Sequence, residues 1–443
     1  MTILIKILQF VMSLSILVLI HEMGHFVMAK IFKTRVEKFY LFFDPWFSLF
    51  KYKRGETEYG VGWLPLGGYV KISGMIDESL DREQMKQPAQ PWEFRSKTSG
   101  QRLLIMTGGV LFNFISALLI YVFVLYAWGE TYLPNSNVKY GIVTDSVGYA
   151  MGLRNGDKIL TIDNQYVDDF LKITPDIVLN DRKTIQVDRD GQIINIDIPR
   201  EYIAQVLKNK GQIEPRTPFG PFIISAFGKE SPAKDAGVLS GDELIAIDDV
   251  RFIWYDEFQK YLSDNKNRAV LLNVLRKGEN VNIPVTPTSA GMLGVASNRT
   301  FSQIFELRTI RYGFLQSFPA GINKGVRTIG DYLKQFRLIF SRDTKAYESL
   351  GGFITIGSIF PGVWDWQVFW NMTALLSIIL AVMNILPIPA LDGGHVMFLL
   401  WEVVTGRKPS DKFLEYAQIT GMIILFSLLI FANGNDILKL LRN

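Results

Sequence analysis

Four long apolar stretches limit the folds open to this chain more than any other feature of its sequence. They cover residues 7–29, 103–128, 366–401 and 416–435. Each is long enough to cross a bilayer as a helix, which takes about 20 residues. The chain is 48% hydrophobic and only 20% charged, a mixture typical of membrane segments joined to soluble parts. Lys6 before the first stretch resembles the start of a signal peptide, but no small-residue cleavage site follows, so we expect a retained helix.

The basic residues predict which connections lie in the cytoplasm. Thirteen Lys or Arg fall within residues 30–102, and Arg407, Lys408 and Lys412 follow the third stretch. The positive-inside rule places both connections on the cytoplasmic side, so both termini and residues 129–365 are expected outside. A net charge of +4 gives no reason to expect a nucleic-acid partner, and the absence of cysteine excludes disulfides and thiolate metal ligands.

Residues 21–25 read His-Glu-Met-Gly-His and lie inside the first apolar stretch, although the chain has only three histidines. His21 and His25 are four residues apart, so on a helix they face the same way and can bind one Zn²⁺. A zinc ion lowers the pKa of a bound water towards about 7. Glu22 is placed to take the proton of that water and to return it to the leaving amine. The alternative is that both histidines only bond to neighbouring helices.

A catalytic zinc usually has three protein ligands, so a third must come from elsewhere in the chain. Asp392 is the first charged residue in the third stretch, and it follows Pro387 and Pro389, which interrupt a helix. Irregular backbone at membrane depth is tolerated where it lines a cavity. His395 competes with Asp392 for the role, and Asp392 is also suited to start a new helix.

The region between the second and third stretches contains an internal repeat. Residues 152–163 align with residues 237–248 at an offset of 85, and each copy has a small-residue turn before an alternating strand. The copies are either peptide-binding domains or spacers and steric filters. Residues 307–340 have apolar positions at helical spacing, which predicts an amphipathic helix that lies on the membrane surface or packs on the second copy.

These motifs, in this order, resemble the site-2 protease family. The resemblance rests on the His-Glu-x-x-His sequence in the first helix and on Asn384 followed by Pro387-x-Pro389-x-Leu391-Asp392-Gly393 in a later one. The repeat resembles a pair of PDZ domains, and PDZ domains bind peptides by adding a strand to a sheet edge. The chain is thus similar to the bacterial branch, which cleaves anti-sigma factors and remnant signal peptides within the membrane, after a first cut by another protease.

The resemblance implies roles for particular residues. His21, His25 and Asp392 would be zinc ligands and Glu22 the acid/base. Asn384 would hold the substrate, and Asn113 would contact it as part of a Gly-x-x-x-Asn pattern that begins at Gly109, although the family's proline after that glycine is Val110 here.

The sequence from Leu64 to Val70 resembles the family's membrane-entering β-hairpin, expected at about residues 57–74. Gly67, Gly68 and Tyr69 in it are predicted substrate contacts, because an edge strand there would pair with an unwound substrate. The alternative is an ordinary cytoplasmic hairpin. The family's earlier Gly-aromatic-Gly sequence is replaced here by Phe43-Asp44-Pro45.

The expected fold is a polytopic α-helical membrane protein with four spans, two PDZ-like α/β domains outside the cytoplasm and the hairpin. We expect the segments to be divided as follows: first span 1–30; cytoplasmic segment 31–100; second span 101–128; PDZ-like copies 129–217 and 218–305; amphipathic segment 306–345; third membrane region 346–402; fourth span and C-terminus 403–443.

The predicted function is that of an intramembrane zinc metalloprotease of a bacterial inner membrane, acting on membrane-spanning proteins within the lipid bilayer. Two other interpretations are a membrane-anchored zinc protease with a soluble site and a PDZ scaffold without catalysis. The first needs a glutamate ligand in a hydrophilic helix, whereas the best candidate is Asp392 in an apolar one. The second predicts no zinc. The sequence does not identify the substrate or the oligomeric state.

Overall fold

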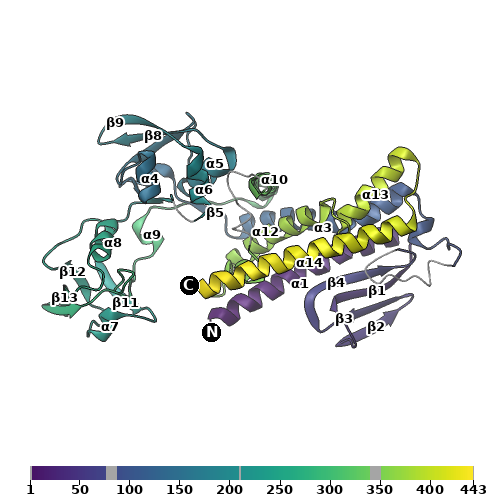
Figure 1. The fold of residues 1–443 in the computed structure, drawn as a ribbon, viewed down its shortest axis with the longest axis horizontal. Helices are drawn as coiled ribbons and strands as arrows, with labels where there is room; N and C mark the ends of the chain where they lie inside the picture. The colour runs from purple at the N-terminus through teal and green to yellow at the C-terminus, as the bar shows by residue number, and fades with distance from the viewer. Residues whose placement is uncertain (1, 76–86, 209–210, 340–350, 443) are drawn as a thin grey trace. The chain divides into compact units, whose positions relative to one another are not determined.

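A computed structural model of the chain describes residues 2–75, 87–208, 211–339 and 351–442 (Figure 1). Six of the eight predicted segments (1–30, 31–100, 129–217, 306–345, 346–402 and 403–443) lie partly outside these described residues. The chain divides into two compact units. One comprises Met1–Gly129, Arg311–Phe336 and Tyr347–Asn443, and the other comprises Glu130–Ile310 with Arg337–Ala346.

The first unit contains the four predicted apolar helices. They are α1 (Thr2–Ile31), α3 (Ser99–Ala127), α12 (Trp366–Ile385) and α14 (Asp411–Arg442). All four are long and apolar enough to cross a membrane, and the fourth candidate span, Lys412–Lys439, is longer than the sequence predicted. A capping box at Thr98, in which Thr98 and Gln101 satisfy each other's backbone groups, fixes the start of α3.

Helix α3 is the centre of this bundle, since it packs against α1, α12 and α13 (Asp392–Thr405). Two glycines bring α1 and α3 together. A methyl group added to Gly24 would lie 2.3 Å from the Gly108 carbonyl oxygen, so neither position has room for a side chain. This close approach sets the distance between the histidines of α1 and the side chains of α3.

The break between α12 and α13 follows from the two prolines. Residues before proline favour extended backbone, and Leu386 has ψ 143°, which ends α12 at Ile385. Ala390 then takes a left-handed φ of 80°, and α13 begins at Asp392. The predicted third membrane region is therefore two helices joined by a bent loop, residues 386–391.

Residues 36–72 form a four-stranded sheet of β1 (Val36–Phe43), β2 (Phe50–Arg54), β3 (Thr57–Val61) and β4 (Leu64–Ile72). The strand order is β2-β3-β1-β4, so the prediction of a simple hairpin at 57–74 is wrong in its pairing. β1 lies between β3 and β4 and pairs with both, parallel to β3 and antiparallel to β4. The chain crosses the end of β1 at Gly62, where a Cβ would lie 2.1 Å from the Phe43 carbonyl oxygen.

Two further helices complete the unit. The amphipathic segment forms α10 (Phe314–Ile339), whose buried residues Ser317, Gly321 and Gly325 face α3; a Cβ on Gly321 would touch Val122 and one on Gly325 would touch Leu118. Helix α11 (Phe353–Ser358) is held by Asp436 of α14, which accepts hydrogen bonds of 2.9 Å from the backbone N–H groups of Gly352 and Thr355.

The second unit contains the predicted repeat, and the two copies share an order of elements. The first copy has β6 (Ile142–Thr144), α4 (Ser146–Met151), β7 (Lys158–Ile162), α5 (Ile173–Asn180), β8 (Thr184–Arg189), β9 (Gln192–Asp197), α6 (Arg200–Val206) and β10 (Ile213–Pro215). The second has β11 (Phe222–Phe227), α7 (Pro232–Asp235), β12 (Glu243–Ile247), α8 (Tyr255–Asp264), β13 (Val270–Arg276), β14 (Glu279–Val285) and β15 (Val295–Ser297). Strands β5 (Glu130–Tyr132) and β16 (Arg308–Ile310) pair at the two ends of the unit, and α9 (Phe301–Ile304) precedes β16.

Each copy contains an ion pair at the equivalent position. Arg189 binds Asp157 at 2.7 Å in the first copy, and Arg276 binds Asp242 at 2.7 Å in the second. Each aspartate follows a glycine of left-handed φ, Gly156 or Gly241.

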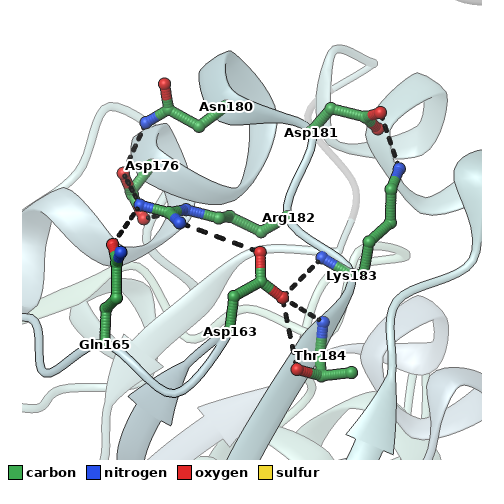
Figure 2. Close-up of polar contacts among 8 residues, drawn as sticks. All are labelled: Asp163, Gln165, Asp176, Asn180, Asp181, Arg182, Lys183 and Thr184. Atoms are coloured by element: carbon green, nitrogen blue, oxygen red, sulfur yellow. Dashed lines mark hydrogen bonds and ion pairs between the residues drawn. The ribbon is translucent and has the colours of Figure 1, made fainter.

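The turn after β7 is fixed by a second group of polar contacts. Asp163 Oδ1 accepts hydrogen bonds from the backbone N–H groups of Lys183 and Thr184, and Arg182 bridges Asp163 to Asp176 of α5 (Figure 2). In the second copy Asp248 Oδ1 accepts from the Leu271 N–H in the same way, but the Tyr261 hydroxyl takes the place of the arginine. The repeat is thus a repeat of fold, while its PDZ-like identity stays a prediction.

Candidate functional site

The structure brings three predicted residues from two distant segments to one point. His21 and His25 lie one turn apart on α1, and Asp392 is the first residue of α13. The two Nε2 atoms are 3.3 Å apart, and Asp392 Oδ2 lies 3.1 Å from that of His21 and 3.2 Å from that of His25. His395, the competing ligand, lines the neighbouring cavity but does not belong to this cluster of the described residues.

The three atoms fit a zinc ion. In a tetrahedral zinc site the ligand atoms are about 3.3 Å apart, because each lies about 2.0–2.1 Å from the metal. Asp392 Oδ2 is buried, and the two imidazole nitrogens lie within 3.2 Å of it, but within the described part of the chain no contact to it has the geometry of a hydrogen bond. A buried carboxylate oxygen without a hydrogen bond is costly unless an ion compensates it. The Asp392 side chain does not cap α13 either, so the alternative role at a helix start does not account for its position.

The cluster opens into a cavity of about 540 Å³. Glu22 lies on its wall beside the two histidines, together with Asn384, whose Nδ2 is 3.4 Å from His21 Nε2. The remaining wall comes mainly from the sheet and the bent loop: Lys38, Phe43, Gly68, Tyr69, Val70, Lys71, Ile72, Met75, Met106, Ala390, Leu391, His395 and Gln418.

Strand β4 borders the cavity along its edge. It is the outermost strand of the order β2-β3-β1-β4, and the successive residues 68–72 all line the cavity. Side chains of a strand alternate between faces, so five successive lining residues mean that the cavity follows the backbone edge itself. Gly68 allows this approach to α1, because a Cβ there would lie 2.8 Å from Val18 Cγ1 and 3.5 Å from Glu22 Cγ.

The other predicted substrate contacts are placed unequally. Tyr69 lines the cavity, whereas the Phe43 ring covers Gly67 and lies 2.8 Å from where its Cβ would be. Asn113 is fully buried on α3, and its Nδ2 lies 3.1 Å from His21 Nδ1, on the side of the ring away from Asp392. The predicted contact of Asn113 with a substrate stays a prediction, and the contact that the structure gives this side chain is with His21.

Several residues at the site were missed by sequence reasoning. His25 Nδ1 lies 2.9 Å from the carbonyl oxygen of Ile105, and Gln418 of α14 accepts a 3.2 Å hydrogen bond from the Ala390 N–H in the bent loop. The sequence did contain a signal for the contacts of α3 with the histidines. Gly109 and Asn113 are four residues apart, as His21 and His25 are, so each pair lies on one side of its helix. Nothing in the sequence pointed to Gln418.

Comparison with known proteins identifies the family of this chain. The model of peptidase family M50 matches residues 9–428. The chain belongs to peptidase family M50. It is 30% identical to the regulator of sigma E protease of Haemophilus influenzae over 455 residues, which covers 98% of each chain. A putative zinc metalloprotease of Rickettsia conorii is 27% identical over 98% of this chain and 99% of its own length.

A third relative, the regulator of sigma-E protease of Salmonella typhimurium, is 26% identical over 97% of this chain and 98% of its own length. Together with the four apolar helices, these findings confirm that the chain is an intramembrane zinc metalloprotease of the site-2 type that acts in regulated proteolysis. They also confirm zinc as its metal and the inner membrane as its location. A catalytically inactive scaffold and a zinc protease with a soluble site are thereby excluded.

Proposed function

We propose that His21, His25 and Asp392 hold the catalytic zinc of this M50 protease and that Glu22 is its acid/base. The convergence of Nε2, Nε2 and Oδ2 at 3.1–3.3 Å supports this assignment more than any other observation. When bound, the metal supplies a Lewis acid that polarises the peptide carbonyl and makes a water molecule acidic near neutral pH.

The protein's own residues do the rest of the chemistry. Glu22 accepts the proton of the attacking water and passes it to the amine nitrogen as the peptide bond breaks. Its place on the cavity wall, one residue after His21, gives it access to a substrate carbonyl held there. Asn384 lines the cavity beside His21, where its amide can donate to that carbonyl.

The substrate is an extended segment of a membrane-spanning protein. A helical segment keeps its carbonyl groups in internal hydrogen bonds, so it must unwind before water attacks. The outer edge of β4 supplies replacement backbone partners for an added strand, with the scissile bond next to Glu22. Gly68 and Tyr69 line the cavity along this edge, whereas Gly67 is covered by the Phe43 ring.

The physiological substrates we infer are anti-sigma factors and remnant signal peptides, already shortened by another protease. Several curated relatives are named regulators of sigma E protease. The positive-inside rule favours a location outside the cytoplasm for residues 129–365 and both termini. The PDZ-like copies, 129–217 and 218–305, would then contact the part of a substrate that lies outside the membrane before its spanning segment reaches the site.

Substitution of Glu22 by Gln tests the mechanism. The Glu22→Gln protein, reconstituted in lipid vesicles with a single-pass substrate, is expected to bind zinc normally and to lose cleavage by at least about 10²-fold. Glu56→Gln is the matched control, because Glu56 is an exposed carboxylate that pairs with Lys30. His21→Ala and Asp392→Ala should instead lose zinc. Retained cleavage by Glu22→Gln would refute the acid/base assignment, and full zinc affinity in Asp392→Ala would refute the ligand set.

A further inference from the structure

One face of α3 contacts both histidines of the cluster. Ile105, Gly109 and Asn113 follow one another at intervals of four residues, so they lie along one stripe of the helix. Each of the three contacts an imidazole ring in a different way. Ile105 offers its carbonyl oxygen, Gly109 leaves room because it has no side chain, and Asn113 presents its side-chain amide.

His25 is oriented by the main chain. Its Nδ1 lies 2.9 Å from the Ile105 carbonyl oxygen, which only accepts hydrogen bonds. The proton of a neutral His25 ring is therefore on Nδ1, and the lone pair is on Nε2, the atom that faces Asp392 Oδ2. A metal needs that lone pair, so Ile105 fixes His25 in the tautomer that binds zinc.

Gly109 provides the room for both rings. A Cβ added at this position would lie 2.4 Å from His25 Nε2 and 2.8 Å from His21 Nε2. The two imidazoles thus rest against bare backbone, and the next contact along the stripe is the side chain of Asn113.

His21 differs from His25 because its outer nitrogen faces a side chain. Asn113 is fully buried, its amide nitrogen lies 3.1 Å from His21 Nδ1, and its Oδ1 is buried with no hydrogen-bond partner among the described residues. An amide N–H that donates to Nδ1 leaves the ring proton on Nε2, which then has no lone pair for a metal. With the carboxamide turned by 180°, Oδ1 accepts from Nδ1–H and the Nε2 lone pair is free.

We propose that Asn113 is a positioning residue for zinc, which orients His21 by accepting a hydrogen bond from its Nδ1–H through Oδ1. The carboxamide orientation is then coupled to metal binding: amide nitrogen towards the ring favours the tautomer that does not bind, and oxygen towards the ring favours the one that does. Burial of Asn113 outside the cavity wall separates this role from substrate contact. The inference rests on the zinc site proposed above.

The effect is measurable as zinc affinity. Loss of such an outer hydrogen bond to a ligand histidine typically weakens metal binding about 10–100-fold. Asn113→Ala is expected to raise the zinc dissociation constant by that factor in the purified full-length protein in detergent, measured by competition with a chelator. Asn113→Asp should keep affinity near that of the wild type, since a carboxylate oxygen accepts the same hydrogen bond.

Thr373→Val is the matched control, since Thr373 is also fully buried and donates to Ser13 between α12 and α1 without touching the histidines. Its zinc affinity should not change. The visible spectrum of the Co²⁺-substituted protein gives a second measurement, and we expect it to shift in Asn113→Ala but not in Thr373→Val. The helix content of each variant, followed by circular dichroism, separates misfolding from a change at the site.

Two outcomes would overturn the inference. Wild-type zinc affinity and an unchanged Co²⁺ spectrum in Asn113→Ala would show that His21 needs no partner at Nδ1. Loss of affinity in Asn113→Asp equal to that in Asn113→Ala would show that the position requires an amide donor instead. If wild-type protein bound no zinc, or if His21→Ala bound it fully, the proposed ligand set would fail rather than the role of Asn113.

Discussion

The Tyr69 hydroxyl donates a hydrogen bond of 2.9 Å to Asp44 Oδ1 and so ties the edge strand β4 to the turn after β1. Asp44 also accepts a 2.9 Å hydrogen bond from Ser48, within the same turn. The Tyr69 ring stacks on Tyr40, with ring centres 5.3 Å apart, and on Phe43 at 6.2 Å. Asp44 lies where the resemblance predicted a Gly-aromatic-Gly sequence. Tyr69, the proposed substrate contact, is thus held in this chain by Asp44, Tyr40 and Phe43.

Loss of the Asp44 carboxylate should therefore weaken substrate binding more than catalysis. A hydrogen bond to a charged group contributes about 1.5 kcal/mol or more, which corresponds to roughly a tenfold rise in KM for Asp44→Ala with kcat less affected. Tyr69→Phe keeps the stacked ring and removes only the hydroxyl, so its effect should be no larger. Cleavage of a reconstituted single-pass substrate at several concentrations measures both constants. An unchanged KM in Asp44→Ala would mean that Tyr69 is positioned by stacking alone.

Gly109→Ala tests the space between the two imidazoles. The added methyl group would lie within 2.4–2.8 Å of atoms of both rings, closer than carbon and nitrogen approach without a bond. Since both proposed zinc ligands must move, we expect zinc affinity to fall at least about tenfold and cleavage to fall with it. Gly100→Ala is the control, because a Cβ at Gly100, in the first turn of the same helix, meets nothing within 4 Å. Normal zinc content in Gly109→Ala would contradict the close packing of α1 on α3.

The Asp242–Arg276 ion pair predicts how the second repeat copy responds to acid. Hydrogen bonds from Arg276 hold the pKa of Asp242 below its usual value, although burial opposes them. A folded-state pKa below the unfolded value of about 3.9 stabilises the fold above that pH, and the contribution is lost as pH falls through the folded pKa. Asp242→Asn should remove it and lower the stability of this copy by about 1–3 kcal/mol at pH 7.

Hydrogen exchange of the full-length protein measures this effect locally. Amides of β12 and β13 should exchange faster in Asp242→Asn at pH 7, and the difference from wild type should shrink below about pH 4. Strands β7 and β8 of the first copy are an internal control, because their equivalent pair, Asp157–Arg189, is intact. Equal protection of β12 in both proteins at pH 7 would show that the ion pair contributes no stability.

The sequence was sufficient for those parts of the structure that depend on local spacing. Apolar length predicted four helices, and the spacing of four between His21 and His25 predicted two nitrogens on one side of α1. Asp392 could be proposed as the third zinc ligand because a charged residue after two prolines in an apolar stretch is unfavourable without a binding partner. Each of these inferences uses residues close together in the chain.

The other parts of the fold and of the site depend on how distant segments pack and pair, which local sequence patterns do not specify. The insertion of β1 between β3 and β4 results from long-range pairing across a crossing at Gly62, so a hairpin was predicted instead. Asn113 lies 92 residues from His21, and which side chain of α3 meets the ring is decided by the contact of Gly24 with Gly108. Similarly, the support of the bent loop comes from α14, which the sequence identified only as a span.

Gly421 of α14 packs against the bent loop that precedes Asp392. A Cβ on Gly421 would lie 1.7 Å from the carbonyl oxygen of Pro389, so the helix contacts the bent loop backbone directly. One turn earlier, Gln418 accepts a hydrogen bond from Ala390, which holds its left-handed φ of 80°. Gly421→Ala must therefore displace the loop that carries Asp392. We expect at least a tenfold loss of zinc affinity and of cleavage, while Gly434→Ala, with nothing within 4 Å on the same helix, behaves as wild type. Full zinc affinity in Gly421→Ala would show that Asp392 is positioned by α12 and α13 alone, without α14.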